Sequence, residues 1–554
     1  MDKLWEITLG DLLDQQAARH PNQDCVIYND RPFRTTYAEF RDLVNLTAKG
    51  FLKLGVKHGD HVAIWATNVP QWMLTMWATA KIGAVLVTVN TNYKVFEAEY
   101  LLRQSDTHTL VMIDGFKDSN YVEIMKQLVP ELEGARPGEW QSEGLPFLKN
   151  IIFCGDDSHD GMMGWEELYE LGRQVSDEEL AAAQAQVDIH DVVNMQYTSG
   201  TTGFPKGVML THYNIVNDGK CIGDCMNFSI ADRLCIQVPL FHCFGCVLGV
   251  MAAVTHATSM IMVETFRPAV SLKAIHEEKC TALHGVPTMF IALLDHPDFK
   301  KVDFSHMRTG IMAGSPCPIK VMRQVVDEMN MTEITIAYGL TEASPVCTQT
   351  TVHDSLEARV STVGKALPHI ECKVVDPETG EECPHGVPGE FMARGYNIMK
   401  GYYKMPEATA QAVTPEGWLH SGDLATRDEH GYYRITGRIK DMIIRGGENI
   451  YPKEIEECLY TNPKISDVQV VGVPSEAYGE EVMAYVILNQ GETITVEEVK
   501  EFLAARIARH KIPKYVSFIN EFPMTASGKI QKFKLRDMAV QELSLQDAAN
   551  IETA

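Results

Sequence analysis

Residues 61–89 read HVAIWATNVPQWMLTMWATAKIGAVLVTV. The apolar segments at 61–67 and 84–89 predict two short strands, and the stretch at 71–81 between them predicts a helix. The same order of helix and strand is then repeated at 96–104 and 109–113. Short apolar strands that alternate with helices are typical of a parallel sheet covered by helices on both faces. This part of the chain therefore predicts an α/β fold.

The alternation of strands and helices resumes after a glycine-rich loop. Five further apolar segments predict strands at 234–240, 259–263, 281–284, 309–313 and 333–338. Because each run of strands is separated by helical stretches, each run predicts its own parallel sheet. We therefore expect two packed, doubly wound α/β subdomains.

The pattern changes after Pro345. Alternating segments at 363–375 and 389–396, with a turn at Pro377–Gly380, predict a small antiparallel β-barrel. From Asp441 onward the chain predicts a compact α+β domain, with helices at 452–460 and 496–508 and strands at 468–473 and 482–488. The expected fold is α/β: a large N-terminal domain of two doubly wound subdomains plus a small barrel, followed by an α+β C-terminal domain.

Composition excludes several classes of function. The 554-residue chain has a net charge of −25 and a pI near 5.2, which argues against general binding of nucleic acid. The first residues lack a basic region followed by an apolar run, so we expect no secretory signal. The stretch at 247–263 is too short and too polar for a transmembrane segment. Thirteen scattered cysteines favour a cytoplasmic location, and Cys243 and Cys246, a lone CxxC, are interpreted as packing residues.

The loop at 197–207 reads YTSGTTGFPKG. Glycine lets a backbone turn tightly and direct successive N–H groups inward, where they form an anion site. Serine and threonine hydroxyls add donors, and Lys206 adds a positive charge. The loop therefore predicts a polyphosphate site. It does not match the Walker A pattern, because Lys206 lies between Pro205 and Gly207.

The stretch Tyr338–Glu342 directly follows a predicted strand. Ligands bind at the carboxyl ends of the strands in open parallel sheets. Tyr338 can stack on a purine there, and Glu342 can hold Mg²⁺, which prefers carboxylate oxygens and substrate phosphates.

Two later clusters supply further polar side chains. Asp423 follows a tight glycine turn and can accept both hydroxyls of a ribose, while Arg438 can bridge a sugar hydroxyl and a phosphate. Lys529 lies on a Ser–Gly turn within a locally basic stretch at 506–536. A basic segment of this kind, in a chain this acidic, is suited to approach a triphosphate.

Together these motifs resemble the adenylate-forming superfamily, which includes acyl- and aryl-CoA synthetases, peptide-synthetase adenylation domains and firefly luciferase. They occur in the order 197–207, 338–342, 421–423, 437–438 and 528–529, and the resemblance extends from about residue 36 to residue 536. Within that superfamily, Pro239–His242 and Arg445–Pro452 are in the style of AMP-forming, medium-chain fatty-acyl-CoA synthetases.

The resemblance implies an N-terminal adenylation domain at 1–437, a hinge at 438–441 and a mobile C-terminal lid at 442–554. It also implies two half-reactions. A carboxylic acid and MgATP form acyl-AMP and pyrophosphate, and the thiol of CoA then displaces AMP. Splitting the reaction in this way replaces one difficult step with two easier ones.

The resemblance also assigns residues. Lys529, His242 and Glu342 are the expected catalytic residues, and Glu342 and Thr198 are the expected Mg²⁺ ligands. The expected ATP-binding residues are Thr198, Ser199, Gly200, Thr201, Thr202, Gly203, Lys206, Gly314, Ser315, Tyr338, Gly339, Thr341, Asp423 and Arg438. In-line attack on the α-phosphorus places negative charge near Lys529, whose cation would stabilise it.

Lys440 occupies the hinge position of the superfamily. Closure would bring in Lys529 for adenylation, and rotation would replace it with the Gly446–Gly447 loop beside the pantetheine of CoA. Luciferase has a lysine where this chain has Ile444, and Arg445 stands one residue later. Arg445 is therefore grouped with the CoA and hinge residues, with its role left open.

Two positions bear on the substrate. Peptide-synthetase domains have an aspartate where this chain has His242, so the sequence argues against an α-amino acid. Acetate-specific members have a tryptophan where this chain has Gly339, so a deeper pocket is expected. The expected acyl-pocket residues are His242, His284, Val286, Met312, Ala313, Gly314 and Gly339. Their mostly apolar character suits a fatty or aryl tail, with His242 as a gate beside the acyl carbonyl.

The leading hypothesis is an acyl-CoA synthetase for a medium-chain fatty acid. An aryl- or hydroxycinnamate-CoA ligase shares all the ATP motifs and remains the close alternative. A nucleotide-binding protein without catalysis and a phosphotransferase, which would release ADP, are the alternatives from other classes. The sequence leaves open the acyl chain length, transfer to a carrier protein instead of CoA, and the oligomeric state, with which a homodimer is compatible.

Overall fold

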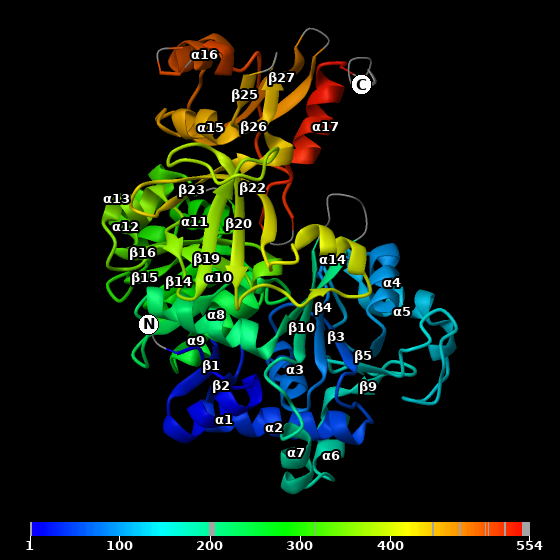
Figure 1. Cartoon of the computed structure of the whole chain (residues 1–554). Coiled ribbons are helices and arrows are strands. Elements are labelled where there is room, and N and C mark those ends of the chain that lie inside the picture. The colour runs from blue at the N-terminus through cyan, green and yellow to red at the C-terminus, as the bar shows by residue number, and fades with distance from the viewer. Residues whose placement is uncertain are drawn as a thin grey trace.

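The computed structural model describes residues 3–198, 205–315, 317–445, 448–475, 478–504, 506–507, 509–525 and 528–545. A large N-terminal domain contains two mainly parallel sheets, and a smaller C-terminal domain lies at the top of the view in Figure 1. The α/β class predicted from the sequence is confirmed.

The first sheet has eight strands in the order β21-β11-β10-β4-β3-β5-β8-β9. Their bounds are β3 His61–Trp65, β4 Val85–Thr88, β5 Thr107–Met112, β8 Asn150–Phe153, β9 Met163–Gly164, β10 Val192–Thr198, β11 Lys206–Thr211 and β21 Gly401–Tyr402. The strands from β10 to β9 are parallel, and β11 and β21 add an antiparallel edge. The strands predicted near residues 61, 84 and 109 are confirmed.

The helix predicted at 71–81 is α3 (Pro70–Lys81), and it is buried on all sides. Its proline stands in the first turn, where the missing N–H group leaves no hydrogen bond unmade. Trp72 and Trp77 are fully buried, and apolar residues surround them on every side of the helix. A helix that is apolar all round belongs inside a large core, and α3 packs there against α1, α2, β3 and β4.

The second sheet has nine strands in the order β18-β17-β16-β15-β14-β12-β13-β1-β2. Their bounds are β1 Asp24–Tyr28, β2 Phe33–Thr36, β12 Arg233–Ile236, β13 Ser259–Met262, β14 Ala282–Gly285, β15 Thr309–Met312, β16 Glu333–Gly339, β17 Val346–Gln349 and β18 Lys365–Ala366. Strands β16 to β1 are parallel, as predicted. The N-terminal strand β1 joins this sheet through β13, so the two subdomains are interleaved along the chain.

The region predicted as a small barrel differs from the expectation. It forms a four-stranded antiparallel sheet of β19 (Ile370–Val375), β20 (Gly389–Gly395), β22 (Leu419–Arg427) and β23 (Tyr433–Arg438). In the part of the chain that the structure describes, its edge strands β19 and β23 do not pair with each other. Backbone hydrogen bonds between Tyr433 and residues 363–364 instead attach β23 beside the nine-stranded sheet.

The C-terminal domain is α+β, as predicted. Its sheet contains β24 (Ile443–Arg445), β25 (Glu448–Ile450), β26 (Ile465–Ser475), β27 (Gly479–Leu488) and β28 (Tyr515–Phe518). The helices are α15 (Pro452–Tyr460), α16 (Val496–Ala504) and α17 (Lys532–Glu542), so α16 ends before the predicted residue 508. Two apolar clusters of its own residues form the core of this domain.

Further helices cover the two large sheets (Figure 1). They are α1 Leu9–Arg19, α2 Tyr37–Lys53, α4 Val95–Gln104, α5 Tyr121–Leu128, α6 Trp165–Gly172, α7 Asp177–Gln184, α8 His212–Cys225, α9 Ala252–Thr255, α10 Pro268–Glu277, α11 Pro287–Leu294, α12 Ile319–Glu328, α13 Leu356–Ser361 and α14 Pro406–Ala412. A π-helical segment at Phe244–Met251 precedes α9. Among the described residues, no helix combines the length and apolar character needed to cross a bilayer.

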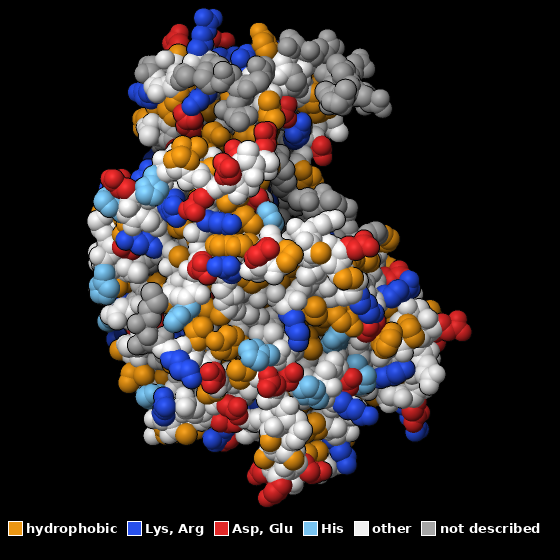
Figure 2. Space-filling model, viewed as in Figure 1, with side chains coloured by type: hydrophobic (Ala, Val, Ile, Leu, Met, Phe, Trp, Pro, Cys, Tyr) orange, Lys and Arg blue, Asp and Glu red, His pale blue; other side chains and the backbone are white. Residues whose placement is uncertain are grey.

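The surface carries charges of both signs. On the face shown in Figure 2, acidic and basic side chains are intermixed, and the described residues there form no continuous basic band. Nucleic acid is bound through its phosphates by clustered Lys and Arg. The described residues on this face therefore form no such cluster.

Candidate active site

Four neighbouring strands of the nine-stranded sheet end beside residues predicted for the site. Strand β12 leads to Pro239–His242, β14 to Val286, β15 to Ala313 and Gly314, and β16 to Tyr338. These strands are parallel, so their carboxyl ends lie at one edge of the sheet. The topology thus collects at that edge residues that are distant in the sequence.

Asp423 joins this edge from the four-stranded sheet. Its carboxylate accepts a hydrogen bond from the Tyr338 hydroxyl at 2.8 Å and pairs with Arg438 Nε at 3.2 Å. Asp423 and Arg438 are direct register partners on β22 and β23, which explains why residues fifteen positions apart meet. Burial raises the pKa of Asp423, while the Arg438 cation and the Tyr338 hydroxyl oppose that shift. The three side chains predicted for the nucleoside therefore form one cluster.

Glu342 is held in a second cluster. It lies in a short 3₁₀ turn at Thr341–Ala343, and its Oε1 accepts a hydrogen bond from the Tyr402 hydroxyl at 2.8 Å. Lys206 Nζ lies 4.9 Å from the centroid of the same tyrosine ring. Tyr402 therefore links the lysine of the glycine-rich loop to the predicted metal ligand, and a cation over a ring face is itself favourable.

The two strands that flank the glycine-rich loop, β10 and β11, form an antiparallel pair. Thr198 ends β10 and Lys206 begins β11, and the two are register partners across the antiparallel pair. The predicted residues Ser199, Gly200, Thr201, Thr202 and Gly203 lie outside the described residues. Thr198 and Lys206 thus lie side by side, and β11, which carries Lys206, also pairs with β21 through Val208 and Tyr402.

Lys529 reaches the site from the C-terminal domain. Its loop is closed by a β-bridge between Met524 and Ile530, and the Thr288 hydroxyl of α11 donates to the Gly528 carbonyl at 3.2 Å. Gly528 has a φ of +80°, a left-handed conformation that favours glycine. The side chain of Lys529 then runs toward Gly314, where an added Cβ would stand 3.5 Å from Lys529 Cε.

The electrostatic surroundings of Lys529 identify its neighbours. Burial lowers the pKa of its amine, the Cys243 thiol raises it, and the Arg438 cation lowers it. The carboxylates of Asp423 and Glu342 also act on the amine and favour its charged form. The lysine predicted from the far end of the sequence therefore lies among the predicted ATP and metal residues.

His242 follows β12 and is half-buried. Its Nδ1 accepts a hydrogen bond from the Phe244 backbone N–H at 3.1 Å, which leaves Nε2 as the protonated nitrogen of the neutral ring. Burial, with a further contribution from the Lys529 cation, lowers the pKa of His242 to about 3. At neutral pH His242 is therefore a neutral side chain that can donate one hydrogen bond from Nε2.

Val286 lies between two glycines of the site. An added Cβ would stand 3.1 Å from a Val286 methyl at Gly314 and 2.9 Å from its other methyl at Gly528. Gly314 has a φ of +87°, so both its conformation and its close neighbour favour glycine. Ala313 is buried and Ser315 is half-buried in the same turn, and Thr341 is buried with its hydroxyl 3.7 Å from Cys243 Sγ.

His284 does not lie where the sequence analysis expects it. Its side chain is fully buried, Nδ1 accepts from the Ile311 N–H at 3.2 Å, and Nε2 lies 3.1 Å from the Leu248 carbonyl. The ring also stacks between Phe228 and Phe244. Because both ring nitrogens are bound by backbone groups, His284 is a packing residue in this structure and offers an acyl chain no free polar atom.

Gly339 also has a different explanation from the one predicted. An added Cβ at this position would stand 1.8 Å from the Pro345 carbonyl oxygen. Gly339 pairs with Val346 where β16 and β17 shift register, and the backbones approach closely there. The missing side chain is therefore required by the turn that carries Glu342, and it does not by itself deepen an acyl pocket.

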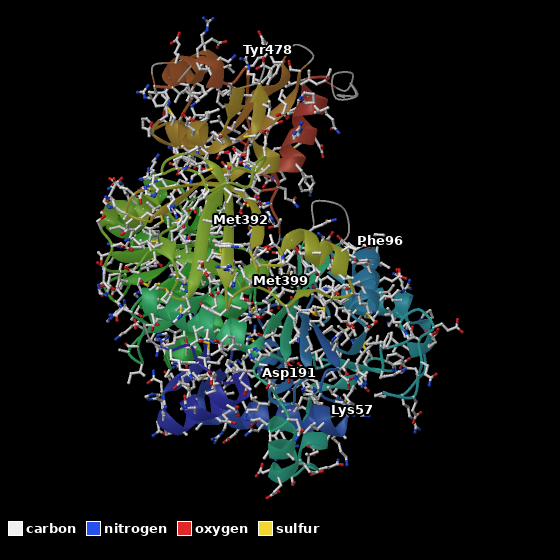
Figure 3. The ribbon with its side chains drawn as sticks, viewed as in Figure 1. Lys57, Phe96, Asp191, Met392, Met399 and Tyr478 are labelled. Carbon is white, nitrogen blue, oxygen red and sulfur yellow. The ribbon has the colours of Figure 1, made fainter. Side chains whose placement is uncertain are left out.

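The residues predicted for the hinge and for CoA are placed only in part. Lys440 has its backbone in a 3₁₀ turn at Ile439–Asp441, while its side chain, Gly446 and Gly447 lie outside the described residues. Arg445 binds Glu481 at 2.7 Å and lies 4.5 Å from the Tyr478 ring centroid. Figure 3 shows Tyr478 in the C-terminal domain, well separated from Met399, whose N–H donates to the Glu342 carbonyl.

Sequence reasoning missed three contributors to the site. Tyr402 binds Glu342, Thr288 binds the Lys529 loop, and the Phe391 ring packs edge-on against Tyr338 with centroids 5.0 Å apart. None stands within a recognisable motif. A Gly–Tyr pair after β20 is the weak signal for Tyr402, and the predicted strand at 389–396 contained Phe391 without indicating its partner.

The residues present fit a Mg²⁺ ion that takes most of its ligands from substrate and water. Within the described ranges, no three or more His, Cys, Asp or Glu side chains are arranged to hold a metal ion. Glu342 engages Tyr402 through one carboxylate oxygen, and its second oxygen is suited to a cation. A single protein carboxylate suits Mg²⁺, which usually keeps waters and substrate phosphates as its other ligands.

Comparison with known families gives two matches. The family described as AMP-binding enzyme matches residues 13–403, which is more than half of the chain. The family described as AMP-binding enzyme C-terminal domain matches residues 454–529. The two matches include Tyr338, Glu342 and Lys529, whereas Asp423 and Arg438 lie in the segment between them.

Curated relatives match over almost the whole chain. A putative acyl-CoA synthetase, YngI, of Bacillus subtilis (strain 168) is 54% identical over 99% of this chain and 100% of its own length. The mitochondrial medium-chain acyl-CoA ligase ACSF2 of Danio rerio is 42% identical over 97% of this chain and 89% of its own. The protein of the same name from Homo sapiens is 40% identical over 97% and 88%.

Solved structures share the fold. ATP-bound MatB from Rhodopseudomonas palustris has a TM-score of 0.81 and 28% identity, covering 96% of this chain and 99% of its own. A Mycobacterium tuberculosis fatty acyl CoA synthetase has a TM-score of 0.72 and 27% identity, covering 97% and 99%. The anthranilate CoA ligase AuaEII, in complex with anthranoyl-AMP, has a TM-score of 0.86 at 24% identity, covering 98% and 99%.

Proposed function

This chain belongs to the AMP-binding enzyme family, and we propose on that premise that it is an AMP-forming acyl-CoA synthetase of medium-chain fatty acids. The ATP-dependent ligation of a carboxylic acid to CoA is the activity that its relatives' names and the site support together. The medium-chain preference is supported by the relatives named medium-chain acyl-CoA ligase, at 39–42% identity.

One observation carries the proposal. Lys529, from the C-terminal domain, lies within electrostatic reach of Glu342, Asp423 and Arg438 and runs toward Gly314. A buried cation at this position is suited to the charge that develops when a carboxylate attacks the α-phosphorus of ATP. A protein that only bound nucleotide would have no use for a second domain that inserts a cation there.

In the first half-reaction, each group of residues has a separate task. Asp423 accepts hydrogen bonds from the ribose hydroxyls, Arg438 neutralises charge beside it, and Tyr338 and the Gly314–Ser315 turn border adenine. Lys206 and the glycine-rich loop hold the departing pyrophosphate, together with the hydroxyls of Thr198 and Thr341. Positioning of this kind, combined with fixed charges, accounts for most catalysis of phosphoryl and nucleotidyl transfer.

His242 orients the acid. As a neutral ring with its proton on Nε2, it donates a hydrogen bond to the acyl oxygen without competing with Lys529 for charge. Val286 and Ala313 border the acyl chain as apolar neighbours. Glu342 holds Mg²⁺, which when bound neutralises charge on the phosphates.

The second half-reaction requires a different arrangement of the C-terminal domain. We propose the boundaries 1–437 for the adenylation domain, 438–441 for the hinge and 442–554 for the lid. Rotation at Lys440 withdraws Lys529 and brings the Gly446–Gly447 loop toward CoA, with Arg445 in the same segment. A few backbone torsions suffice for such a hinge.

We propose a cytoplasmic location. All thirteen cysteines are free, as is usual in a reducing compartment. The ACSF2 relatives are named as mitochondrial proteins, so fractionation of the source cells with organelle markers is the direct measurement.

The test is release of pyrophosphate and AMP from ATP and Mg²⁺ with a panel of acids. The panel runs from butyrate through octanoate and decanoate to palmitate, and adds benzoate and coumarate. We expect the highest rate with the medium-chain acids and formation of the corresponding acyl-CoA. Highest activity on aromatic acids would establish the aryl-CoA ligase instead, and ADP as product or no pyrophosphate with any acid would overturn the proposal.

A further inference from the structure

Helix α15 of the C-terminal domain lies against the beginning of α12 in the N-terminal domain. The Glu457 carboxylate lies beside the backbone N–H of Ile319, the first residue of α12, which lowers the pKa of that carboxyl, and both residues line one cleft. α12 has no side-chain cap at its own Pro318 and no acidic residue in its first turn. The first N–H groups of a helix lack partners and carry partial positive charge, so Glu457 supplies from another domain the cap that α12 lacks.

Lys453 makes a second polar contact between the two domains. It precedes Glu457 by four residues and therefore lies on the same face of α15. Its Nζ donates to the Ile435 carbonyl of β23 at 3.0 Å. Burial raises the pKa of Glu457, and the Lys453 cation is the first influence that opposes this shift. One helix face thus presents an anion to a helix N-terminus and a cation to a strand carbonyl.

The contact adjoins the turn expected to face adenine. This turn joins β15 to α12 and contains Gly314, Ser315 and Cys317. Burial raises the pKa of the Cys317 thiol to about 12, and Lys453 and Glu457 act on it in opposite directions. Both charged side chains therefore lie within electrostatic reach of the turn from which Gly314 faces Lys529.

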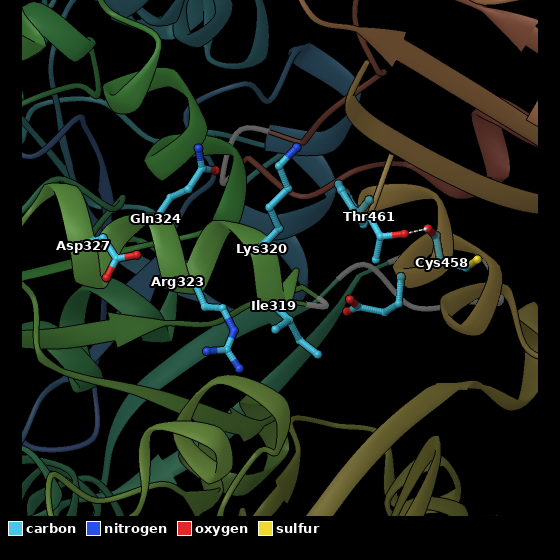
Figure 4. A pocket seen from close by; sticks show the side chains of 9 residues that line it. Ile319, Lys320, Arg323, Gln324, Asp327, Cys458 and Thr461 are labelled. Atoms are coloured by element: carbon cyan, nitrogen blue, oxygen red, sulfur yellow. Dashed lines mark hydrogen bonds between the residues drawn. The ribbon is translucent and has the colours of Figure 1, made fainter. Parts of the chain in front are cut away.

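A cleft of about 650 Å³ separates the two helices beside this contact. Figure 4 shows Ile319, Lys320 and Arg323 of α12 on one side and Cys458 and Thr461 on the other. Because open space flanks the contact, the two helices can separate here without breaking a packed core. In contrast, the apolar clusters of the C-terminal domain are built from its own residues.

The neighbouring glutamates of α15 behave differently. Glu454 accepts two hydrogen bonds from Lys511 at 2.7 Å each, and Glu456 accepts one from Lys532 at 2.6 Å. Both partners lie in the C-terminal domain. These bonds remain intact when that domain rotates as a rigid body. The contacts of Glu457 and Lys453 are broken, because their partners lie in the N-terminal domain.

We propose that Glu457 and Lys453 form a two-point latch that holds the C-terminal domain where Lys529 reaches the nucleotide, and that the latch opens before the CoA step. Both are positioning residues, since they act through Lys529. The inference rests on the proposed function, because it assigns the latch to the first of the two half-reactions.

The test compares the two half-reactions in latch variants. Glu457→Ala removes the cap, Glu457→Gln keeps an acceptor without the charge, and Lys453→Met removes the second point. Adenylation is measured as single-turnover pyrophosphate release from ATP and octanoate, and the CoA step as octanoyl-CoA formation from supplied octanoyl-AMP. We expect the ratio of the adenylation rate to the CoA-step rate to fall about three- to tenfold in Glu457→Ala, with Glu457→Gln intermediate.

Glu454→Gln is the matched control, since it changes the same charge on the same helix within the C-terminal domain. Its ratio should equal that of the wild type, and thermal unfolding midpoints check that every variant is folded. An unchanged ratio in both Glu457→Ala and Lys453→Met, or an equal loss in both half-reactions, would overturn the latch. Failure of the wild type to release pyrophosphate with any acid would instead overturn the proposed function.

Discussion

The N-terminal and C-terminal domains bring side chains to the same site by different means. Tyr338, Val286 and Gly314 lie at or just beyond the carboxyl ends of parallel strands, and the register of the nine-stranded sheet determines where they lie. Lys529 instead stands on a loop whose position depends on how a whole domain docks. In the described part of the chain the docking contacts include hydrogen bonds from Thr288 to Gly528 and from Lys453 to Ile435.

This difference separates the residues that bind the nucleotide from the residue that acts in only one half-reaction. Residues held by a sheet stay in place through a catalytic cycle, so they suit groups needed in both half-reactions, such as those that hold AMP. A residue held by a few polar contacts can be withdrawn at low energetic cost, since each hydrogen bond contributes only about 1 kcal/mol net. Substitutions in the two domains should therefore affect different steps, and the following predictions test that division.

The largest effect is expected for Lys529→Ala. Loss of the cation should slow adenylation by about 10²- to 10³-fold, the usual cost of removing one group that stabilises transition-state charge. Formation of acyl-CoA from supplied acyl-AMP should remain within a few-fold of the wild type, because Lys529 has been withdrawn by then. Single-turnover measurements of each half-reaction provide the comparison.

Lys534→Ala is a suitable control for Lys529→Ala, since Lys534 is exposed on α17 in the same domain. It should leave both half-reactions unchanged. Equal losses in the two half-reactions of Lys529→Ala would mean that the lysine stays at the site throughout, and the contrast between the domains would be lost.

The second prediction concerns a residue fixed by the sheet. Gly339→Ala places a Cβ against the Pro345 carbonyl, and relieving that contact must shift the turn that carries Glu342. We expect a loss of about 1–3 kcal/mol in stability and a fall in adenylation. Denaturant midpoints and adenylation rates measure the two effects. Gly164→Ala, at a glycine with open space around it, is the control.

The alternative outcome is also informative. If Gly339→Ala keeps its stability and instead shifts the preference toward shorter acids, the position borders the acyl pocket after all. That result would restore the interpretation made from the sequence and contradict the close backbone approach.

The strand-end part of the site was predictable because local sequence carries it. Apolar strands followed directly by glycine or polar residues identify the edge of a parallel sheet, and Tyr338 and Gly314 lie at that edge. The Ser–Gly turn before Lys529 is likewise a local signal. These residues needed only the order of elements and the rule that parallel strands end at one edge.

The remainder depends on contacts between distant segments. Tyr402 meets Glu342 because β21 pairs with β11, and a strand of two residues has no periodicity to detect. His284 stands at the end of a predicted strand, where a pocket residue is expected. Its two ring nitrogens are nevertheless hydrogen-bonded to backbone groups of Leu248 and Ile311. The predicted barrel failed for a similar reason, since strand alternation does not reveal whether a sheet closes.

A third prediction uses the buried histidine. Burial lowers the pKa of His284 from its ordinary value of 6.5 to about 4. Between those values the unfolded chain binds a proton that the folded chain does not, so the stabilising contribution is complete above pH 6.5 and is lost as pH falls toward 4. For one such group the complete loss is on the order of 3 kcal/mol.

We expect His284→Gln to flatten the decline of the denaturant midpoint between pH 7 and pH 5, whatever its effect at pH 8. The slope is the readout, because repacking around glutamine changes stability at every pH alike. His430→Gln, at an exposed histidine, controls for the loss of a histidine as such. A wild-type slope in His284→Gln would show that its ring does not contribute to acid sensitivity.

The smallest effect is expected for Tyr402→Phe, which tests whether the sheet also fixes the metal ligand. The substitution removes the hydroxyl that donates to Glu342 and keeps the ring beneath Lys206. A hydrogen bond to a charged group contributes about 1.5–3 kcal/mol, and water can replace part of it here, so we expect an adenylation rate about three- to tenfold lower at limiting Mg²⁺. High Mg²⁺ should restore the rate, because the lost bond orients the carboxylate and leaves it chemically intact. Tyr403→Phe is the control at the next residue along the chain. It removes a hydrogen bond to Asp106 and should show no such dependence on Mg²⁺. If Tyr402→Phe stays equally slow at every Mg²⁺ concentration, Tyr402 acts on Lys206 and the glycine-rich loop instead. In that case the sheet does not fix the position of the metal ligand Glu342.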